Sequence, residues 1–105
     1  MKYRLPIRDR LIEALRSGRY LQGDEFMRSF DDRWCLLGVA LDLVGVEWFR
    51  DRRAYNVKYE TREPLINEQG LWPVLGAISD FQKKSGKRLS FPETADWLEL
   101  NTFST

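Results

Sequence analysis

The stretch RWCLLGVALDLVG, residues 33–45, is the only run of the chain in which nearly every residue is apolar. At helical spacing it carries two adjacent apolar stripes, and a helix that is apolar on most of its faces is usually buried. Asp31 and Asp32 precede it as candidate N-caps, and Gly45 is suited to close it. We therefore expect residues 33–45 to form the central helix of the core.

Two further helices are predicted by apolar spacing and by residues suited to helix ends. Residues 6–18 carry one narrow apolar stripe and end at Gly18, a residue that readily adopts the conformation closing a helix. Residues 73–85 begin with Pro73, which suits a first helical turn, and stop before Gly86. We expect the first of these helices to lie against the central one with its arginines outward.

The clearest local signal is Ser-Phe-Pro-Glu at residues 90–93. It matches the capping box, in which the hydroxyl of Ser90 accepts a hydrogen bond from the third helical residue while Glu93 reaches back. The pattern predicts a helix that runs to about residue 101, after which residues 102–105 are expected to fray.

The sequence AYNVKYE at residues 54–60 alternates between two faces, as a half-buried strand does. Because a lone strand leaves its backbone unpaired, we expect an antiparallel hairpin with residues 46–50, joined by a third short strand near Tyr20. Glu63 and Pro64 are expected to end the strand.

These segments predict an α+β fold for one domain of residues 1–105. About four helices would pack around the central apolar helix (33–45), beside a small antiparallel hairpin or sheet at 46–61. A chain of 105 residues has room for one real hydrophobic core.

Composition excludes several classes of function. The chain has no histidine, so Ser–His–Asp triads, Cys–His pairs and histidine-based metal sites are excluded. Its single cysteine, Cys35, lies in the apolar run and is expected to be a small buried side chain. No apolar run approaches the roughly 20 residues of a membrane span, and the charged N-terminus lacks a signal core, so we expect a cytoplasmic protein.

The carboxylates do not form a recognisable metal site. Asp42 is the one ionisable residue inside the apolar run, and it must face solvent, cap a backbone group or pair with an arginine. The pairs Asp24-Glu25 and Asp31-Asp32 lack the spacing and the glycine of a calcium loop. No metal, no cofactor and no enzymatic activity are predicted.

Three charged surfaces are candidates for contact with a partner. The first combines arginines with aromatic rings at the predicted hairpin tip, a composition typical of protein hot spots and of nucleic-acid stacking surfaces. Its residues are Trp48, Arg50, Arg52, Arg53 and Tyr55. The second is acidic and suited to a basic host protein; it comprises Asp24, Glu25, Asp31, Asp32, Glu93, Asp96 and Glu99. The third is basic and suited to a phosphate backbone; it comprises Arg8, Lys83, Lys84, Lys87 and Arg88, with Arg52 and Arg53.

Three motifs resemble a family of small uncharacterised proteins from bacteriophages and prophages. They are ALRSGRYLQG (14–23), DRWCLLGVALDLVGVEW (32–48) and LSFPETADWLE (89–99); the strand segment between the last two also takes part, and the resemblance covers nearly the whole chain. The family commonly has further cysteines in the apolar helix, where this chain has Leu36 and Ala40. The resemblance therefore implies a phage setting, and it implies no reaction and no metal or redox role.

The leading expectation is a phage accessory protein that binds a host macromolecule. Its most concrete form is a counter-defence, anti-CRISPR-like inhibitor in the cytoplasm of the host cell that acts by protein–protein contact. A small nucleic-acid-binding module is the second choice, although a net charge of +1 argues against it. A structural, virion-associated protein is the third, and a homodimer is also compatible with the sequence.

Overall fold

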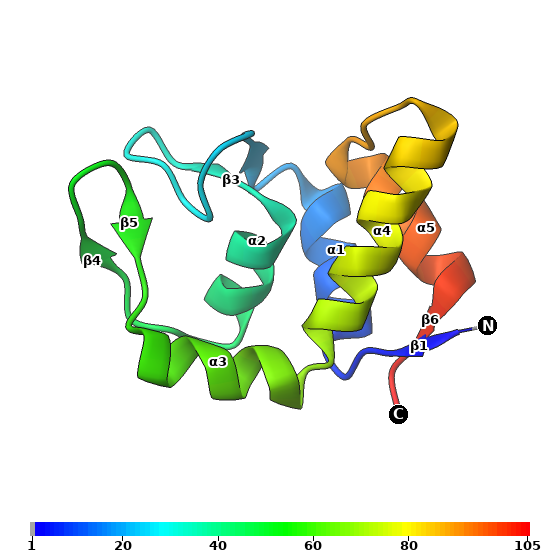
Figure 1. Cartoon of the computed structure of the whole chain (residues 1–105), viewed down its shortest axis with the longest axis horizontal. Coiled ribbons are helices and arrows are strands. Elements are labelled where there is room, and N and C mark those ends of the chain that lie inside the picture. Colours follow the sequence, from blue (N-terminus) through cyan, green and yellow to red (C-terminus); the bar gives the residue numbers. More distant parts are fainter. Residues whose placement is uncertain (1) are drawn as a thin grey trace.

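The computed structural model describes residues 2–105 and places five helices and six short strands among them (Figure 1). The helices are α1 (Arg8–Ser17), α2 (Leu36–Leu43), α3 (Tyr59–Glu68), α4 (Leu71–Ser85) and α5 (Phe91–Asn101). The strands are β1 (Tyr3–Arg4), β2 (Leu21–Gln22), β3 (Arg33–Trp34), β4 (Phe49–Arg50), β5 (Tyr55–Asn56) and β6 (Thr102–Phe103). The predicted α+β fold is confirmed.

The central apolar helix is confirmed in position but is shorter than predicted. Val39, Ala40 and Leu41 of α2 are fully buried, and Gly45 follows the helix with a φ of +83°. The helix begins only after Cys35, because the two residues before Cys35 are strand β3. Their backbone groups are taken up by pairing with β2, so they cannot start a helix.

The prediction that Asp31 and Asp32 cap this helix is wrong. The N-cap is Cys35, whose side chain makes no capping hydrogen bond. Asp32 lies in a tight turn with a φ of +55°, and its amide donates to the carbonyl of Ser29 at 3.0 Å. Asp is among the residues that tolerate this left-handed conformation, which suits it to the turn.

The other predicted helices are confirmed with small changes at their ends. Gly18 and Gly86 close α1 and α4 with φ values of +78° and +68°. The capping box is complete: Ser90 Oγ accepts from the amide of Glu93 at 3.3 Å, and Glu93 Oε1 accepts from the amide of Ser90 at 3.0 Å.

The capping box gives stability a defined dependence on pH. The ammonium group of Lys87, followed by hydrogen bonds from Ser90, lowers the pKa of Glu93 from 4.5 to about 2. The folded state stabilises the charged form of this carboxylate. The contribution of Glu93 to the free energy of unfolding is therefore complete above pH 4.5 and is lost as pH falls toward about 2. We expect Glu93→Gln to melt at a lower temperature than wild type at neutral pH, with the difference vanishing in acid. A difference that stays constant with pH would contradict this account.

The prediction that residues 102–105 fray is wrong for β6. Thr102 is 1% exposed, and its hydroxyl donates to the carbonyl of Leu98 at 2.5 Å. β6 pairs in parallel with β1, and the amide of Leu5 donates to the carbonyl of Phe103 at 2.8 Å. The two ends of the described chain therefore lie close together (Figure 1).

The predicted hairpin is present but shorter, and its second strand runs into a helix that the sequence did not predict. β4 and β5 pair antiparallel, with Arg50 opposite Tyr55. The predicted strand 54–60 ends at Asn56, and α3 begins at Tyr59 and passes through Pro64. Pro64 removes one helical hydrogen bond, and it is tolerated here on the exposed side of the helix, four residues after the exposed Glu60.

The third strand predicted near Tyr20 is confirmed as β2, but it does not pair with the hairpin directly. β2 pairs in parallel with β3, and Arg28 forms bridges both to Trp34 of β3 and to Tyr55 of β5. The amide of Tyr55 donates to the carbonyl of Arg28 at 3.0 Å. The segment around Arg28 thus joins the hairpin to the rest of the sheet.

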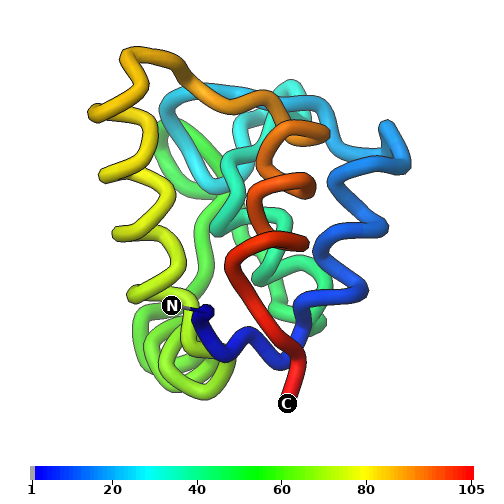
Figure 2. The backbone as a smooth tube through the Cα atoms, turned by 90° about the vertical axis from the view of Figure 1, so that its right-hand side faces the viewer, coloured from blue at the N-terminus to red at the C-terminus, as the bar shows by residue number. Residues whose placement is uncertain are grey.

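Helices α1, α4 and α5 lie at the opposite end of the molecule from the hairpin (Figure 1). Figure 2 shows α5 between α1 and α4, and α1 and α5 pack closely together. α2 lies between these helices and the hairpin, while α3 runs along one edge of the molecule toward α4 (Figure 1). Within residues 2–105 no helix is both long and apolar enough to span a bilayer.

Candidate partner-binding surface

A guanidinium group surrounded by aromatic rings holds the hairpin against the rest of the sheet. The guanidinium carbon of Arg28 lies 4.3 Å from the ring centroid of Tyr55, 4.9 Å from that of Trp34 and 5.9 Å from that of Trp48. Arg28 Nε also donates to Asp32 Oδ1 at 2.7 Å. Because a guanidinium is attracted to the faces of aromatic rings, the contacts of Arg28 hold β3, which carries Trp34, next to β5, which carries Tyr55.

The rings continue inward to the one carboxylate of the central helix. Trp34 makes edge-to-face contacts with Tyr20 and Trp48, at centroid distances of 5.0 and 5.6 Å. Asp42 accepts from the hydroxyl of Tyr20 at 2.6 Å and from Trp48 Nε1 at 3.0 Å. We call Arg28, Tyr20, Trp34, Trp48, Tyr55 and Asp42 the aromatic cluster.

The aromatic cluster explains how the carboxylate of Asp42 is accommodated in an apolar helix. Its carboxylate is partly buried and is satisfied by two neutral donors rather than by the arginine that we expected as one alternative. Partial burial, together with the hydrogen bond to Asp42, raises the pKa of Tyr20 to about 12. Tyr20 therefore keeps its proton and remains a hydrogen-bond donor throughout the physiological range.

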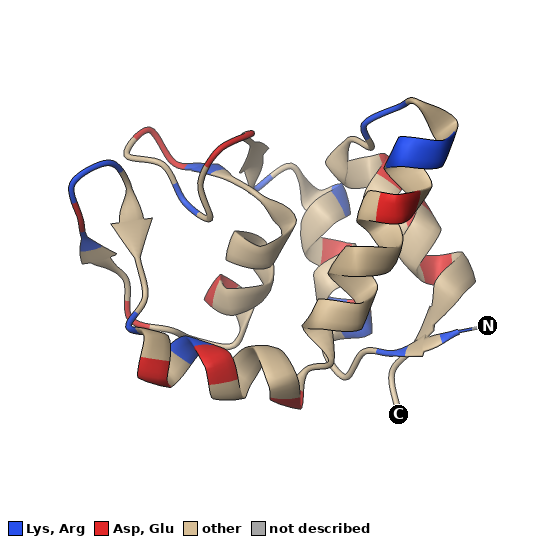
Figure 3. Cartoon of the chain, viewed as in Figure 1, with Lys and Arg blue, Asp and Glu red and all other residues tan. Residues whose placement is uncertain are grey.

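Beyond the cluster, the hairpin tip presents three exposed arginines. The guanidinium carbon of Arg50 lies 4.1 Å from the ring centroid of Phe30, while the side chains of Arg52 and Arg53 extend from the turn. Figure 3 shows this turn as a blue segment at the end of the molecule. We call Arg50, Arg52 and Arg53 the hairpin arginines.

The hairpin arginines have no acidic partner among residues 2–105. The nearest acid in sequence, Asp51, is used by the turn itself. Asp51 accepts from the amide of Arg52 at 2.8 Å and from Asn56 Nδ2 at 3.3 Å. These two bonds, the first of them dominant, lower the pKa of Asp51. The carboxylate thus holds the tip in shape and leaves the guanidinium groups available.

The structure divides the five residues predicted at this surface. Arg50, Arg52 and Arg53 are exposed, as expected for a contact surface. Trp48 and Tyr55 are half-buried in the aromatic cluster, where their rings contact Arg28 rather than the hairpin arginines.

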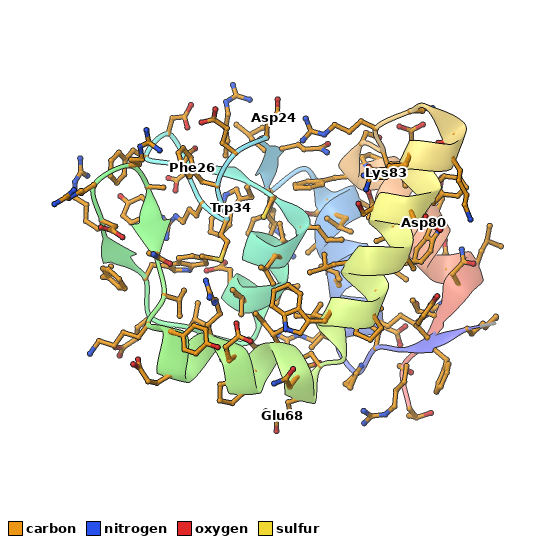
Figure 4. All side chains as sticks on the ribbon, viewed as in Figure 1. Asp24, Phe26, Trp34, Glu68, Asp80 and Lys83 are labelled. Atoms are coloured by element: carbon orange, nitrogen blue, oxygen red, sulfur yellow. The ribbon has the colours of Figure 1, made fainter. Side chains whose placement is uncertain are left out.

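The predicted acidic surface does not form one continuous patch, and most of its carboxylates have partners. Asp24 pairs with Arg88 and Glu93 with Lys87, both contacts joining different segments. Figure 4 shows Asp24 at the upper edge of the molecule, between the hairpin turn and α4.

On α5, the carboxylates of Asp96 and Glu99 share one arginine. Arg16 of α1 contacts both, with a distance of 2.7 Å to Asp96. Glu25 has no ion pair within the described chain and lines a cleft beside the hairpin. Most of the acidic charge is therefore compensated within the protein.

The predicted basic surface is divided: Lys83, Lys84, Lys87 and Arg88 lie at the end of α4 and in the loop after it, and Arg8 lies on α1. Lys87 and Arg88 are used in ion pairs with Glu93 and Asp24. Arg8 donates to the carbonyls of Thr102 and Glu99 at 3.1 and 3.2 Å, and so fastens α1 to the end of α5. Lys84 pairs with Asp80 at 3.1 Å, while Lys83 is exposed on α4 (Figure 4).

Cys35 is half-buried rather than fully buried, and it is free. Burial raises the pKa of its thiol, so the side chain is not an activated thiolate. Between residues 2 and 105 no group of three or more Cys, Asp or Glu side chains is placed to hold a metal ion.

Several residues around the hairpin were missed by sequence reasoning. Arg28 lies in a stretch without clear periodicity, and its role depends on rings that come from three separate segments. Arg62 follows the predicted strand 54–60 and lies on α3 beside the hairpin. The helical spacing of Arg62, Leu65 and Ile66 was the available signal, and the alternation before it obscured the change of period.

The fold and the surface together define a small α+β domain in which the exposed hairpin arginines lie next to the aromatic cluster. The chain belongs to the family described as a domain of unknown function (DUF8296), which matches residues 1–100. No curated protein and no solved structure matches the chain.

Proposed function

We propose that the protein is a non-enzymatic bacteriophage accessory protein that binds a host protein through the hairpin arginines. Its most concrete form is a counter-defence, anti-CRISPR-like inhibitor in the host cytoplasm. The phage setting rests on the motifs at 14–23, 32–48 and 89–99.

The observation that carries this proposal is the contrast in charge pairing. Arg50, Arg52 and Arg53 are exposed without an ion pair in the described chain, whereas the predicted acidic surface is largely compensated. Arginine is enriched at binding hot spots because its planar group makes several hydrogen bonds and stacks on rings. The aromatic cluster favours binding further, since a surface that is already ordered loses less entropy on association.

This reasoning changes the expected chemistry of the partner. The sequence offered acidic faces suited to a basic host protein beside the arginine–aromatic surface, and the charge pairing supports a partner with exposed acidic groups. Nucleic acid also presents negative charge, and it remains the second choice because the other basic residues are dispersed or paired.

Capture of tagged protein from host lysate, with and without nuclease, separates these alternatives. We expect one host protein to be recovered in stoichiometric amount and to survive nuclease. Broad recovery of nucleic-acid-associated proteins that disappears with nuclease would contradict the proposal and favour the nucleic-acid-binding module. Recovery of the chain with only its own copies or virion proteins would instead favour a structural role.

A further inference from the structure

A cleft of about 470 Å³ lies beside the hairpin turn, bounded by the segment 25–27 and by α3. This volume is within the range of pockets that hold small ligands or side chains. The hairpin contributes Arg52, Arg53 and Tyr55 to its lining, and α3 contributes Arg62. Arg52 and Arg53 therefore belong to the exposed turn and also line the cleft.

Three guanidinium groups and two carboxylates line the cleft. The acids are Glu25 and Asp51, and Asp51 is already occupied by the hydrogen bonds of the turn. The cleft consequently carries a small positive excess and a large number of hydrogen-bond donors. A single oxyanion suits such a site, because guanidinium groups bind carboxylates through pairs of directed hydrogen bonds.

Arg62 has donor capacity that the protein does not use. Its only ion pair is a long contact of 3.4 Å with Glu63, and its Nε is buried without any hydrogen-bond partner in the described chain. The guanidinium carbon of Arg62 also lies 5.4 Å from the ring centroid of Tyr59. This contact positions the guanidinium, but the ring does not replace a hydrogen-bond acceptor. The side chain of Arg62 is 26% exposed and lines the cleft, so its accessible N–H groups are available to an acceptor placed there.

Apart from Tyr55 and Asn56, the remaining lining of the cleft is apolar. Phe26 and Met27 are half-buried, and Ala54 is 7% exposed. Figure 4 shows Phe26 on the segment next to the hairpin. A ligand that fills this cleft must therefore bring an apolar group together with its negative charge.

We propose that the cleft takes an acidic side chain and an adjoining apolar or aromatic side chain from one segment of the partner protein. This inference rests on the function proposed above and names the chemistry of the partner. The carboxylate is held by Arg62 together with Arg52 and Arg53 of the turn, and the apolar side chain lies against Phe26 and Met27.

A protein segment fits the cleft better than nucleic acid does. A phosphate backbone carries charge at every nucleotide and would meet Glu25 and Asp51 as well as the arginines. Bases bind single-strand sites by stacking on aromatic faces. The ring of Tyr55 is already covered by Arg28 and contacted edge-on by Phe30, at a centroid distance of 5.5 Å.

The test is a nuclear magnetic resonance titration of the whole protein, labelled with ¹⁵N, with short synthetic peptides. One peptide carries Glu-Phe-Glu at its centre, a matched peptide carries Gln-Phe-Gln, and a short single-stranded oligonucleotide is the third probe. We expect the Glu peptide to shift the Nε–H signal of Arg62 and the amide signals of Phe26 and Ala54, with saturation. The Gln peptide is expected to bind about tenfold more weakly.

Two variants and one control locate the binding. Arg62→Gln and Phe26→Ala are each expected to weaken binding of the Glu peptide about tenfold. Arg19→Gln removes the same charge at an exposed position outside the cleft, and it is expected to bind as wild type does. Circular dichroism of each variant confirms that it is folded before its affinity is compared.

Each contrary outcome has a separate meaning. Unchanged Arg62 and Phe26 signals with the Glu peptide, or equal binding of the Gln peptide, would overturn the cleft proposal. Stronger binding of the oligonucleotide with the same shifted signals would overturn it in favour of nucleic acid. If Arg62→Gln captured the host protein normally while Arg52→Gln/Arg53→Gln lost it, the cleft proposal alone would fail. If Arg52→Gln/Arg53→Gln also captured the host protein normally, the proposed function would fail.

Discussion

Replacing Trp34 by alanine is expected to lower the free energy of unfolding by about 3–5 kcal/mol. Trp34 is 7% exposed and its ring contacts Tyr20, Trp48 and the guanidinium of Arg28. Its removal leaves a cavity between α2 and the hairpin, and it takes one ring away from a partly buried cation. The measurement is urea denaturation followed by circular dichroism, which does not depend on tryptophan fluorescence.

Trp72 is the matched control for this substitution. It is also a tryptophan, on α4, but it is 47% exposed and makes no aromatic contact with the cluster. We expect Trp72→Ala to cost less than about 1 kcal/mol. Equal losses for the two variants would show that the aromatic cluster does not hold the hairpin in the way described.

Gly38→Ala is expected to destabilise the protein by about 3 kcal/mol, although alanine is the better helix former. A Cβ at position 38 would lie 1.8 Å from the carbonyl oxygen of Met27 and 2.6 Å from its carbonyl carbon. Backbone atoms cannot move aside as a flexible side chain does, so the segment that contains Met27 would be displaced. This segment leads into Arg28, and we expect the variant to weaken partner binding as well as folding.

Gly76 provides a control with the opposite sign. It lies inside α4, and a Cβ added there would meet nothing within 4 Å. Gly76→Ala is therefore expected to stabilise the protein by about 0.5–1 kcal/mol. Thermal or urea denaturation of both variants measures the contrast, and stabilisation by Gly38→Ala would contradict the close approach of α2 to the segment before β3.

Local signals in the sequence were sufficient to predict much of the fold. Gly18, Gly86 and the Ser90 capping box marked helix ends correctly, because each acts through neighbouring backbone atoms. The failures came from long-range pairing. Residues 33 and 34 look helical in isolation, but their backbone pairs with β2 across the chain. The helix α3 was missed because alternation before Tyr59 and the presence of Pro64 both argued for an extended segment.

The candidate surface was predictable only in part, for the same physical reason. The sequence placed three arginines at a hairpin tip, and the structure places them there without acidic partners. The contribution of Arg28 and Arg62 could not be predicted, since it depends on segments that meet only in the folded chain. The ion pairs of the acidic surface could not be predicted either, because their partners come from distant segments of the chain.

The most direct test of the account compares how much host protein is captured by three forms of the chain in nuclease-treated lysate. They are wild type, Arg52→Gln/Arg53→Gln and Lys83→Gln/Lys84→Gln; the two variants lose the same charge, from the hairpin turn or from α4. We predict that the hairpin variant loses most of the captured protein, at least about tenfold, while the α4 variant captures as much as wild type. Undiminished capture by the hairpin variant, or equal loss in both variants, would contradict the claim that the hairpin arginines form the binding surface.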